Sequence, residues 1–226
     1  MAAASVSGFD RRQAAYWERD QSYTDPLHVT AVAAARPKIE FVQHVLELPR
    51  SATVLDVGAG NGVFSCQLCE RFDRVTSVDV AWNMIVRNPA HGHKLQCSAY
   101  ELPFSAGSFD LVFCGNLLHH VGDPLRVARE MARVAGSYVV FCEPNRWNLP
   151  LWAYMALIPE ERGGVKFRPA YVRGLARAAG LQVRACESMG LVYERSTPPF
   201  MLPWLRAFDR PVWFGAYTVL VGQKWS

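Results

Sequence analysis

Lysine is scarce in this sequence, and positive charge is not clustered anywhere along it. Only Lys38, Lys94, Lys166 and Lys224 are lysines among the 24 basic residues, and the arginines are scattered over the 226 positions. The net charge of +4 is mild. Because a nucleic-acid-binding domain usually gathers its charge into a stripe or patch, we expect no nucleic-acid partner.

Long apolar runs are also missing. The longest covers residues 149–158 and contains Pro150, and it is about half as long as the roughly 20 residues that span a bilayer. Residues 1–10 lack the apolar segment of a signal peptide. We therefore expect a cytoplasmic protein without stable membrane insertion.

The cysteines are too few and too dispersed for a disulfide framework in a chain of this length. Cys66 and Cys69 form a C-x-x-C pair, but no second pair or nearby histidine completes a zinc set. A spacing of three places both thiols on one face of a helix. We predict two reduced, packed cysteines and no metal site.

What the sequence does contain is a strand that runs into closely spaced glycines. Residues 54–57 are mostly apolar, as expected of a buried strand, and glycines follow as Gly58, Gly60 and Gly62. Residues 63–72 then repeat apolar side chains at helical spacing. A strand, a glycine turn and a helix N-terminus together make a nucleotide-binding corner in an open α/β sheet.

The glycine spacing differs from a dinucleotide fingerprint, because Val63 holds the third position of G-x-G-x-x-G. Residues 55–62, Leu-Asp-Val-Gly-Ala-Gly-Asn-Gly, instead resemble the first motif of class I S-adenosylmethionine-dependent methyltransferases. The resemblance implies S-adenosylmethionine as cofactor, with the Asp56 carboxylate near its methionine ammonium end. It also implies that the cofactor lies against Gly58, Ala59, Gly60, Asn61 and Gly62.

A second acid follows at the expected distance. Residues 74–78 read as a strand that ends at Asp79, which lies 19 positions after Gly60. This is close to the spacing of a carboxylate that binds ribose hydroxyls, although a helix N-cap is the other reading of such an acid. The resemblance implies that Val80 and Met84 help to cover the adenine.

The third strand is expected at residues 94–98, and the residues after it carry the next motif. Residues 98–104, Ser-Ala-Tyr-Glu-Leu-Pro-Phe, resemble the family stretch Asp-Ala-x-x-Leu-Pro-Phe. The resemblance places Ser98, Ala99 and Tyr100 at the adenine. Ser98 departs from the family aspartate, and its hydroxyl accepts a hydrogen bond more weakly than an anion would.

Residues 109–114 predict a fourth strand, and the loop after it should face the reacting methyl group. The resemblance implies that Asn116 and Leu117 line the cofactor. His119 and His120 follow, and histidine is the commonest general base. One of the two, with a preference for His120, is a candidate base for a hydroxyl acceptor. A structural turn with imidazoles bonded to backbone is the alternative.

The N-terminal extension is rich in aromatic and charged residues. Phe9, Tyr16 and Trp17 share one helical side. In the resembled family such extensions often close over the cofactor as a lid, and Tyr16 is the residue we expect to touch it. An amphipathic helix that closes the edge of the sheet is the alternative.

Strands and helices alternate over most of the chain, which predicts a Rossmann-like, doubly wound α/β sheet. The resemblance implies seven strands, mostly parallel with the seventh antiparallel, and helices on both faces. Pro37 is expected in the first turn of a helix. We predict one domain over 1–226, comprising an extension (1–34), a cofactor-binding core (35–145) and substrate-side elements (146–226).

The second half is crowded with aromatic residues, and small-molecule pockets are largely apolar and aromatic. We therefore expect a small-molecule methyltransferase whose acceptor is apolar or cyclic and reacts through O, N or C. Alternatives are a non-catalytic protein of the same fold, a methyltransferase of RNA or protein, and a nicotinamide-dependent oxidoreductase. A homodimer is possible.

Overall fold

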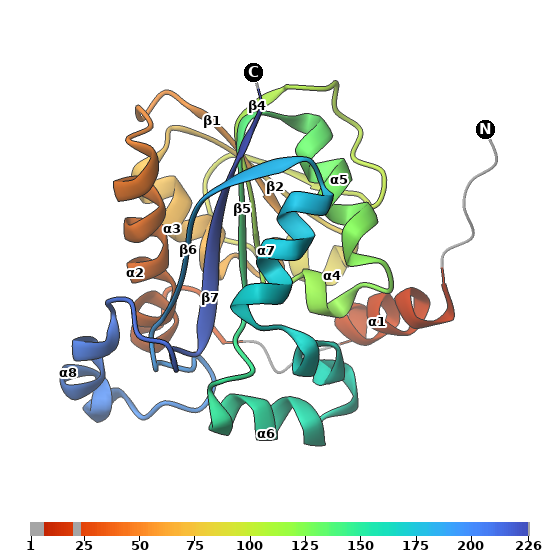
Figure 1. Ribbon diagram of the computed structural model, residues 1–226. Helices are drawn as coiled ribbons and strands as arrows, with labels where there is room; N and C mark the ends of the chain where they lie inside the picture. Colours follow the sequence, from red (N-terminus) through yellow and green to blue (C-terminus); the bar gives the residue numbers. More distant parts are fainter. Residues whose placement is uncertain (1–6, 20–23, 226) are drawn as a thin grey trace.

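One seven-stranded sheet organises the molecule (Figure 1). The computed structural model describes residues 7–19 and 24–225, so the predicted extension over 1–34 is described only for 7–19 and 24–34. The strand order is β3-β2-β1-β4-β5-β7-β6, and β7 runs antiparallel to both β5 and β6. This confirms the predicted fold class. The strands are β1 (Thr53–Val57), β2 (Arg74–Asp79), β3 (His93–Gln96), β4 (Phe109–Gly115), β5 (Ala135–Pro144), β6 (Leu181–Met189) and β7 (Tyr217–Lys224).

Helices cover both faces of the sheet because its strands are apolar on both sides. On one face α2 (Val29–Leu46) and α3 (Val63–Arg71) pack on side chains such as Val54 and Phe113. On the other, α5 (Pro124–Val134) and α7 (Pro169–Ala178) pack on side chains such as Leu55 and Val112. Adjacent strand residues thus enter opposite cores, as the period of two requires.

The start of α2 was predicted incorrectly. The helix begins at Val29, and Pro37 lies inside it rather than in its first turn. The preceding turns are held by packing, since Ala31 and Ala35 are buried against Val63. Tertiary packing of this kind outweighs the single backbone hydrogen bond that an internal proline removes. The predicted boundary at residue 35 therefore falls within a continuous helix.

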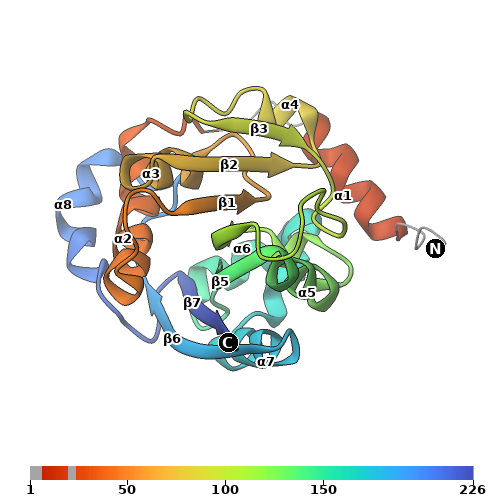
Figure 2. The ribbon, with the colours of Figure 1, turned by 90° about the horizontal axis from the view of Figure 1, so that it is seen from above.

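The carboxyl ends of the parallel strands meet at one end of the sheet, where short elements gather (Figures 1 and 2). None of the helices in the described parts of the chain is long and apolar enough to cross a membrane. The elements at or near this end are α1 (Gly8–Arg19), α4 (Trp82–Ile85), η1 (Leu118–His120), α6 (Leu149–Leu157), η2 (Pro159–Lys166), η3 (Pro199–Met201), α8 (Leu202–Leu205) and η4 (Arg206–Phe208).

Candidate active site

A cavity of about 540 Å³ lies at the carboxyl ends of β1, β2 and β4. Small-molecule sites usually have volumes of about 300–1,000 Å³ and favour this edge of an α/β sheet. Its wall is built from the turn after β1, the end of β2, the loops after β3 and β4, α1, α6 and the segment 193–196. The wall therefore joins segments that are far apart in the sequence.

The glycine turn forms the floor on one side. The backbone N–H groups of Gly58 and Ala59 donate to the Val78 carbonyl at 2.9 and 3.0 Å, which fastens the turn to β2. Gly58 has a φ of +70°, and a β-carbon there would lie 2.8 Å from Cδ1 of Leu117. Glycine is thus required both by the backbone conformation and by the close approach of the loop after β4.

Asp79 lies at the end of β2 and lines the cavity. Its Oδ2 accepts from the Gly60 N–H and its Oδ1 accepts from the Ala81 N–H, both at 2.8 Å. Burial raises the pKa of this carboxyl, against the effect of these hydrogen bonds. Each carboxylate oxygen keeps a further lone pair, so both remain able to accept from a ligand's hydroxyl groups.

Asp56 is placed differently from the sequence expectation. It is not among the residues that line the cavity, because strand alternation turns its side chain toward α3. Its Oδ2 accepts from Ser65 Oγ at 2.6 Å, and Ser65 Oγ also accepts from Ser77 and Asn88. Burial raises the pKa of the Asp56 carboxyl to about 7. The acid thus supports the glycine turn from behind.

Gly62 also lies behind the turn, since a β-carbon there would be 2.2 Å from Oδ1 of Asn88. Asn61 does line the cavity, and its Nδ2 donates to the Thr24 carbonyl at 2.6 Å. The structure therefore brings most of the predicted cofactor-binding residues to one wall. Those that line the cavity are Gly58, Ala59, Gly60, Asn61, Asp79, Val80, Met84, Ser98, Ala99, Tyr100, Asn116 and Leu117.

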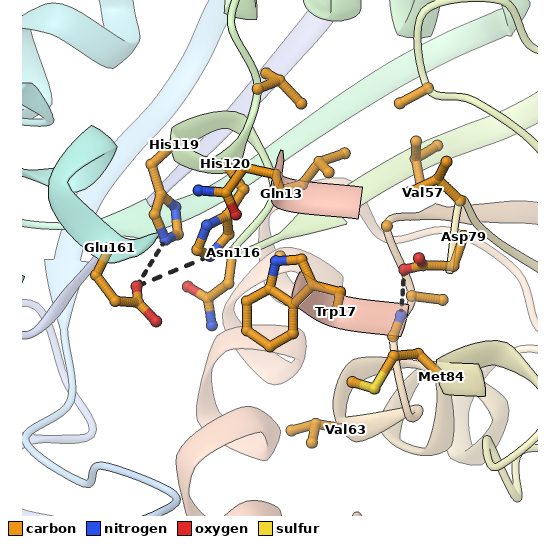
Figure 3. Close-up of a pocket in the computed structure, with 18 of the residues that line it drawn as sticks. Gln13, Trp17, Val57, Val63, Asp79, Met84, Asn116, His119, His120 and Glu161 are labelled. Carbon is orange, nitrogen blue, oxygen red and sulfur yellow. Dashed lines mark hydrogen bonds and ion pairs between the residues drawn. The ribbon is translucent and has the colours of Figure 1, made fainter. Parts of the chain in front are cut away.

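Helix α1 crosses the mouth of the cavity, with Trp17 between the Asp79 side and the histidine side (Figure 3). The lining residue is Trp17 rather than the predicted Tyr16, whose ring packs edge-on against Trp17 at 5.0 Å. Gln13 Nε2 donates to the Glu160 carbonyl at 2.8 Å. Asp10 Oδ1 accepts from the Tyr100 hydroxyl at 2.8 Å. Side chains of α1 thus fasten it to both sides of the cavity.

Asn116, directly after β4, also lines the cavity. Its φ of +59° is in the left-handed region, which asparagine tolerates better than most residues. Its Oδ1 is buried without a hydrogen-bond partner in the described structure. Buried polar atoms are nearly always paired, so an unpaired one that lines a cavity indicates a ligand-binding position.

His119 is enclosed by two carboxylates that come from distant segments. Its Nδ1 lies 2.7 Å from Glu143 Oε2, and its Nε2 lies 3.3 Å from Glu161 Oε2 (Figure 3 shows the latter). Glu143 Oε1 accepts from the N–H groups of Leu117 and Leu118. Burial alone would lower the pKa of His119, but these carboxylates raise it to about 9. His119 is therefore a cation at neutral pH and is not available as a base.

His120 is uncharged, in contrast to His119. Burial and the charge of His119 lower its pKa to about 3, so the ring is neutral at pH 7. Its Nδ1 is buried without a partner in the described structure, and its Nε2 is 3.8 Å from Glu161 Oε2. Its ring packs edge-on against Trp17 at 5.1 Å. His120 thus lines the cavity as a neutral ring. With a pKa of about 3 it is a weak base, and it takes up a proton near pH 7 only where a bound ligand raises that pKa.

One donor atom each from His119, His120 and Glu161 lies within 4.8 Å of the others, which is close enough to share a metal ion. The ion pairs satisfy both nitrogens of His119 without one. The sequence prediction that the protein uses no metal stays a prediction.

Glu143 and Glu161 were not identified from the sequence as site residues. An acid that directly follows an apolar run, as Glu143 follows residues 139–142, is a sequence signal that could have identified Glu143. Glu161 lies in a polar segment and has no local signal. The remaining wall is apolar and aromatic with a few charges, and includes Leu151, Tyr154, Met155, Tyr193, Glu194, Arg195 and Tyr217.

The chain is similar in sequence to known methyltransferases. Residues 55–141 match the model of the family described as methyltransferase domain. The ubiquinone biosynthesis O-methyltransferase of Xanthomonas axonopodis pv. citri (strain 306) is 30% identical over 199 residues, covering 79% of this chain and 80% of that protein. The protein of the same name from Pseudomonas paraeruginosa (strain DSM 24068 / PA7) is 28% identical over 224 residues, covering 88% and 90%.

Solved structures show the same fold. A SAM-dependent methyltransferase of Thermotoga maritima, titled a possible histamine N-methyltransferase, superposes with a TM-score of 0.67 at 18% identity, covering 96% of this chain and 99% of its own. Magnesium protoporphyrin IX methyltransferase from Synechocystis PCC 6803, solved with bound SAH, gives a TM-score of 0.61 at 13% identity, covering 96% and 95%.

Proposed function

Because this chain belongs to the class I S-adenosylmethionine-dependent methyltransferases, we propose that it methylates a hydroxyl oxygen of a small, largely apolar or cyclic molecule. The observation that carries the proposal is His120, a neutral residue of the cavity wall whose buried Nδ1 has no hydrogen-bond partner in the described structure. The relatives named O-methyltransferases support oxygen as the acceptor atom. The aromatic wall supports an apolar acceptor.

The protein's cofactor is S-adenosylmethionine, which supplies an electrophilic methyl group on a sulfonium. The residues present fit it, because Asn116 Oδ1 lacks a partner and Asp79 keeps free lone pairs. We assign Asp79 to the ribose hydroxyls, and Val80, Met84 and the residues 98–100 to the adenine. Asp56 acts through the turn as a positioning residue. Its side chain does not line the cavity, so we assign it to holding Ser65 and the glycine turn in place and not to a direct contact with the ammonium group.

The chemistry left to the protein is alignment and one proton transfer. His120 is the residue that would accept the hydroxyl proton of the acceptor, at Nδ1, while the bound cofactor would supply the electrophilic methyl group. Glu161, held by His119, faces the opposite nitrogen and stabilises the charge that develops on the His120 ring. Helix α1, with Trp17, excludes water from the cavity as a lid.

The test uses purified protein and S-adenosylmethionine labelled in the methyl group, incubated with a cell extract that is then separated into small molecules and macromolecules. We expect label in the organic-soluble fraction, in a product whose added mass is one methylene and which behaves as a methyl ether. Label in protein or RNA would contradict the proposal, as would no transfer to any fraction despite saturable binding of the cofactor.

A further inference from the structure

Helix α6 has no charged side chain, yet one side of it faces solvent. Residues 149–157 read Leu-Pro-Leu-Trp-Ala-Tyr-Met-Ala-Leu. The side chains of Leu149 and Leu157 are 70% and 76% exposed, and Trp152 between them is 39% exposed. A helix at the surface of a soluble protein normally carries polar residues on its outer face, whereas a helix that is apolar all round is normally buried.

The inner side of the same helix is a wall of the cavity. Leu151 and Met155 are buried and line it, and Tyr154 lines it while remaining partly exposed. Helix α6 therefore separates the proposed acceptor space from the exterior by one layer of apolar side chains. The side chains that face the cavity and those that face the exterior are both apolar.

The apolar surface extends beyond α6. Trp147 precedes the helix, and Asn148 at its N-terminus donates to the Phe214 carbonyl at 2.9 Å, which brings the exposed Trp213 to the same region. The exposed Phe200 and Trp204 belong to η3 and α8, which lie at the same end of the molecule as α6 (Figure 1). We call this set the apolar end surface; its members are Trp147, Leu149, Trp152, Leu157, Phe200, Trp204 and Trp213.

The segments that carry the apolar end surface also carry exposed basic residues. Across residues 146–168 and 196–214 the exposed charged residues are all basic: Arg162, Lys166, Arg168, Arg206 and Arg210. Outside these ranges, the exposed Glu187 lines a shallow hollow together with Trp147, Trp213 and the basic Arg173. The acids of the same segments, Glu160, Glu161 and Asp209, are only partly exposed, and Glu161 is turned inward to the histidines. Exposed tryptophan and leucine together with exposed arginine in the same segments is a composition typical of surfaces that lie in the interface of an anionic bilayer.

We propose that the apolar end surface docks on the face of a lipid bilayer that contains anionic lipids, without spanning it. Tryptophan and leucine side chains enter the boundary between headgroups and acyl chains, and the arginines meet the lipid phosphates. Docking there places the α6 wall of the cavity against the bilayer. The docking itself does not depend on catalysis; that an apolar acceptor enters from the lipid rests on the proposed function.

The test is co-sedimentation of the full chain with vesicles, in the absence of cofactor and acceptor. The vesicles are phosphatidylcholine alone or phosphatidylcholine with about 30% phosphatidylglycerol, where the anionic lipid supplies the expected attraction. We expect binding to the anionic vesicles, at least tenfold weaker binding to the neutral ones, and a several-fold loss in 0.5 M salt as screening requires. Tryptophan emission should shift to the blue on binding.

The variant is the triple substitution Leu149→Ser, Trp152→Ser and Leu157→Ser, and the matched control is Leu95→Ser, an exposed apolar residue of β3 at the far edge of the sheet. Vesicle binding should fall at least tenfold in the triple variant and not change in the control, with unaltered circular dichroism in both. Failure of the parent to bind anionic vesicles, or unchanged binding by the triple variant, overturns the proposal. So does a concentration-dependent dimer that the triple variant abolishes in place of vesicle binding, since a second copy is then the occupant. If the triple variant still methylates a water-soluble acceptor, the proposed function stands whichever way docking is decided.

Discussion

Gly163 lies so close to His119 that a β-carbon on residue 163 would be 1.7 Å from the His119 carbonyl oxygen. The next residue is constrained by a side chain, because a β-carbon on Gly164 would be 2.2 Å from Sδ of Met155. Gly163 thus lets η2 pack directly on η1, and Gly164 lets it pack on Met155 of α6. This packing is what brings Glu161 to 3.3 Å from Nε2 of His119.

Replacing Gly163 with alanine should therefore displace η2 and separate Glu161 from His119. We expect the free energy of unfolding to fall by about 2–4 kcal/mol, since the substitution forces a backbone shift and weakens a buried ion pair. Chemical denaturation measures this. The matched control is Gly174→Ala in α7, where no atom lies within 4 Å of the new β-carbon and stability should be unchanged or higher by up to about 1 kcal/mol. Equal stability of the two variants would contradict the packing of η2 on η1.

The two acids of the cofactor motifs should differ in their effect on binding. Asp79→Asn should weaken binding of the demethylated cofactor about 10- to 100-fold, because a hydrogen bond to a charged group contributes about 1.5–3 kcal/mol. Asp56→Asn, behind the turn, should change it by less than about threefold, since the amide oxygen can still accept from Ser65. Isothermal titration calorimetry of both variants decides the matter. Equal losses would place Asp56 in contact with the ligand.

The buried Asp56 should also make stability depend on pH. Burial raises its pKa from 3.8 to about 7 in the folded protein, so folding favours the protonated acid. The stability that this group contributes is complete below pH 4 and is lost as the pH rises through 7. Each tenfold change in proton affinity is worth about 1.4 kcal/mol. The free energy of unfolding of Asp56→Asn minus that of the parent should therefore rise between about pH 4 and pH 7 and level off above pH 7, in unfolding experiments without cofactor. A difference that does not change with pH would show that Asp56 does not titrate in this range.

The two histidines should separate into a chemical and a structural role. His120→Ala should lower kcat about 10²- to 10⁴-fold at unchanged cofactor affinity, which is the usual contribution of a general base. His119→Gln should instead destabilise the fold by about 3–5 kcal/mol, because it leaves the buried Glu143 carboxylate and the partly exposed Glu161 carboxylate without their cation. Steady-state kinetics and thermal unfolding of both variants test the assignment. If His120→Ala keeps the parent's kcat, another group takes the proton.

Helix α1 should control the release of the cofactor product. Asp10 holds this helix through Tyr100 and through the Gly122 N–H at 2.9 Å. Asp10→Ala should raise the dissociation rate of the demethylated cofactor about fivefold or more, since about 1 kcal/mol is the typical worth of one such hydrogen bond. Stopped-flow fluorescence of the tryptophans measures the rate. The matched control is Arg12→Ala, an exposed residue of the same helix, and equal rates in the two variants would exclude a latch at Asp10.

The sequence by itself determined the fold and the cofactor-binding turn. Strand and helix periods, and the need for glycine at φ values such as +70°, act within a few residues and can be read from the chain. Asp79 was placed for the same reason, because the length of one βα unit fixes its distance from Gly60.

Only the tertiary structure decided which polar groups meet. Glu143 and Glu161 reach His119 from 24 and 42 positions away, and this assigns a charged state to His119 and a neutral state to His120. The pleat of β1 turned Asp56 away from the cavity, and the packing of α1 selected Trp17 rather than its neighbour Tyr16. Side-chain direction and long-range contact depend on how packed elements face one another, which no local pattern encodes.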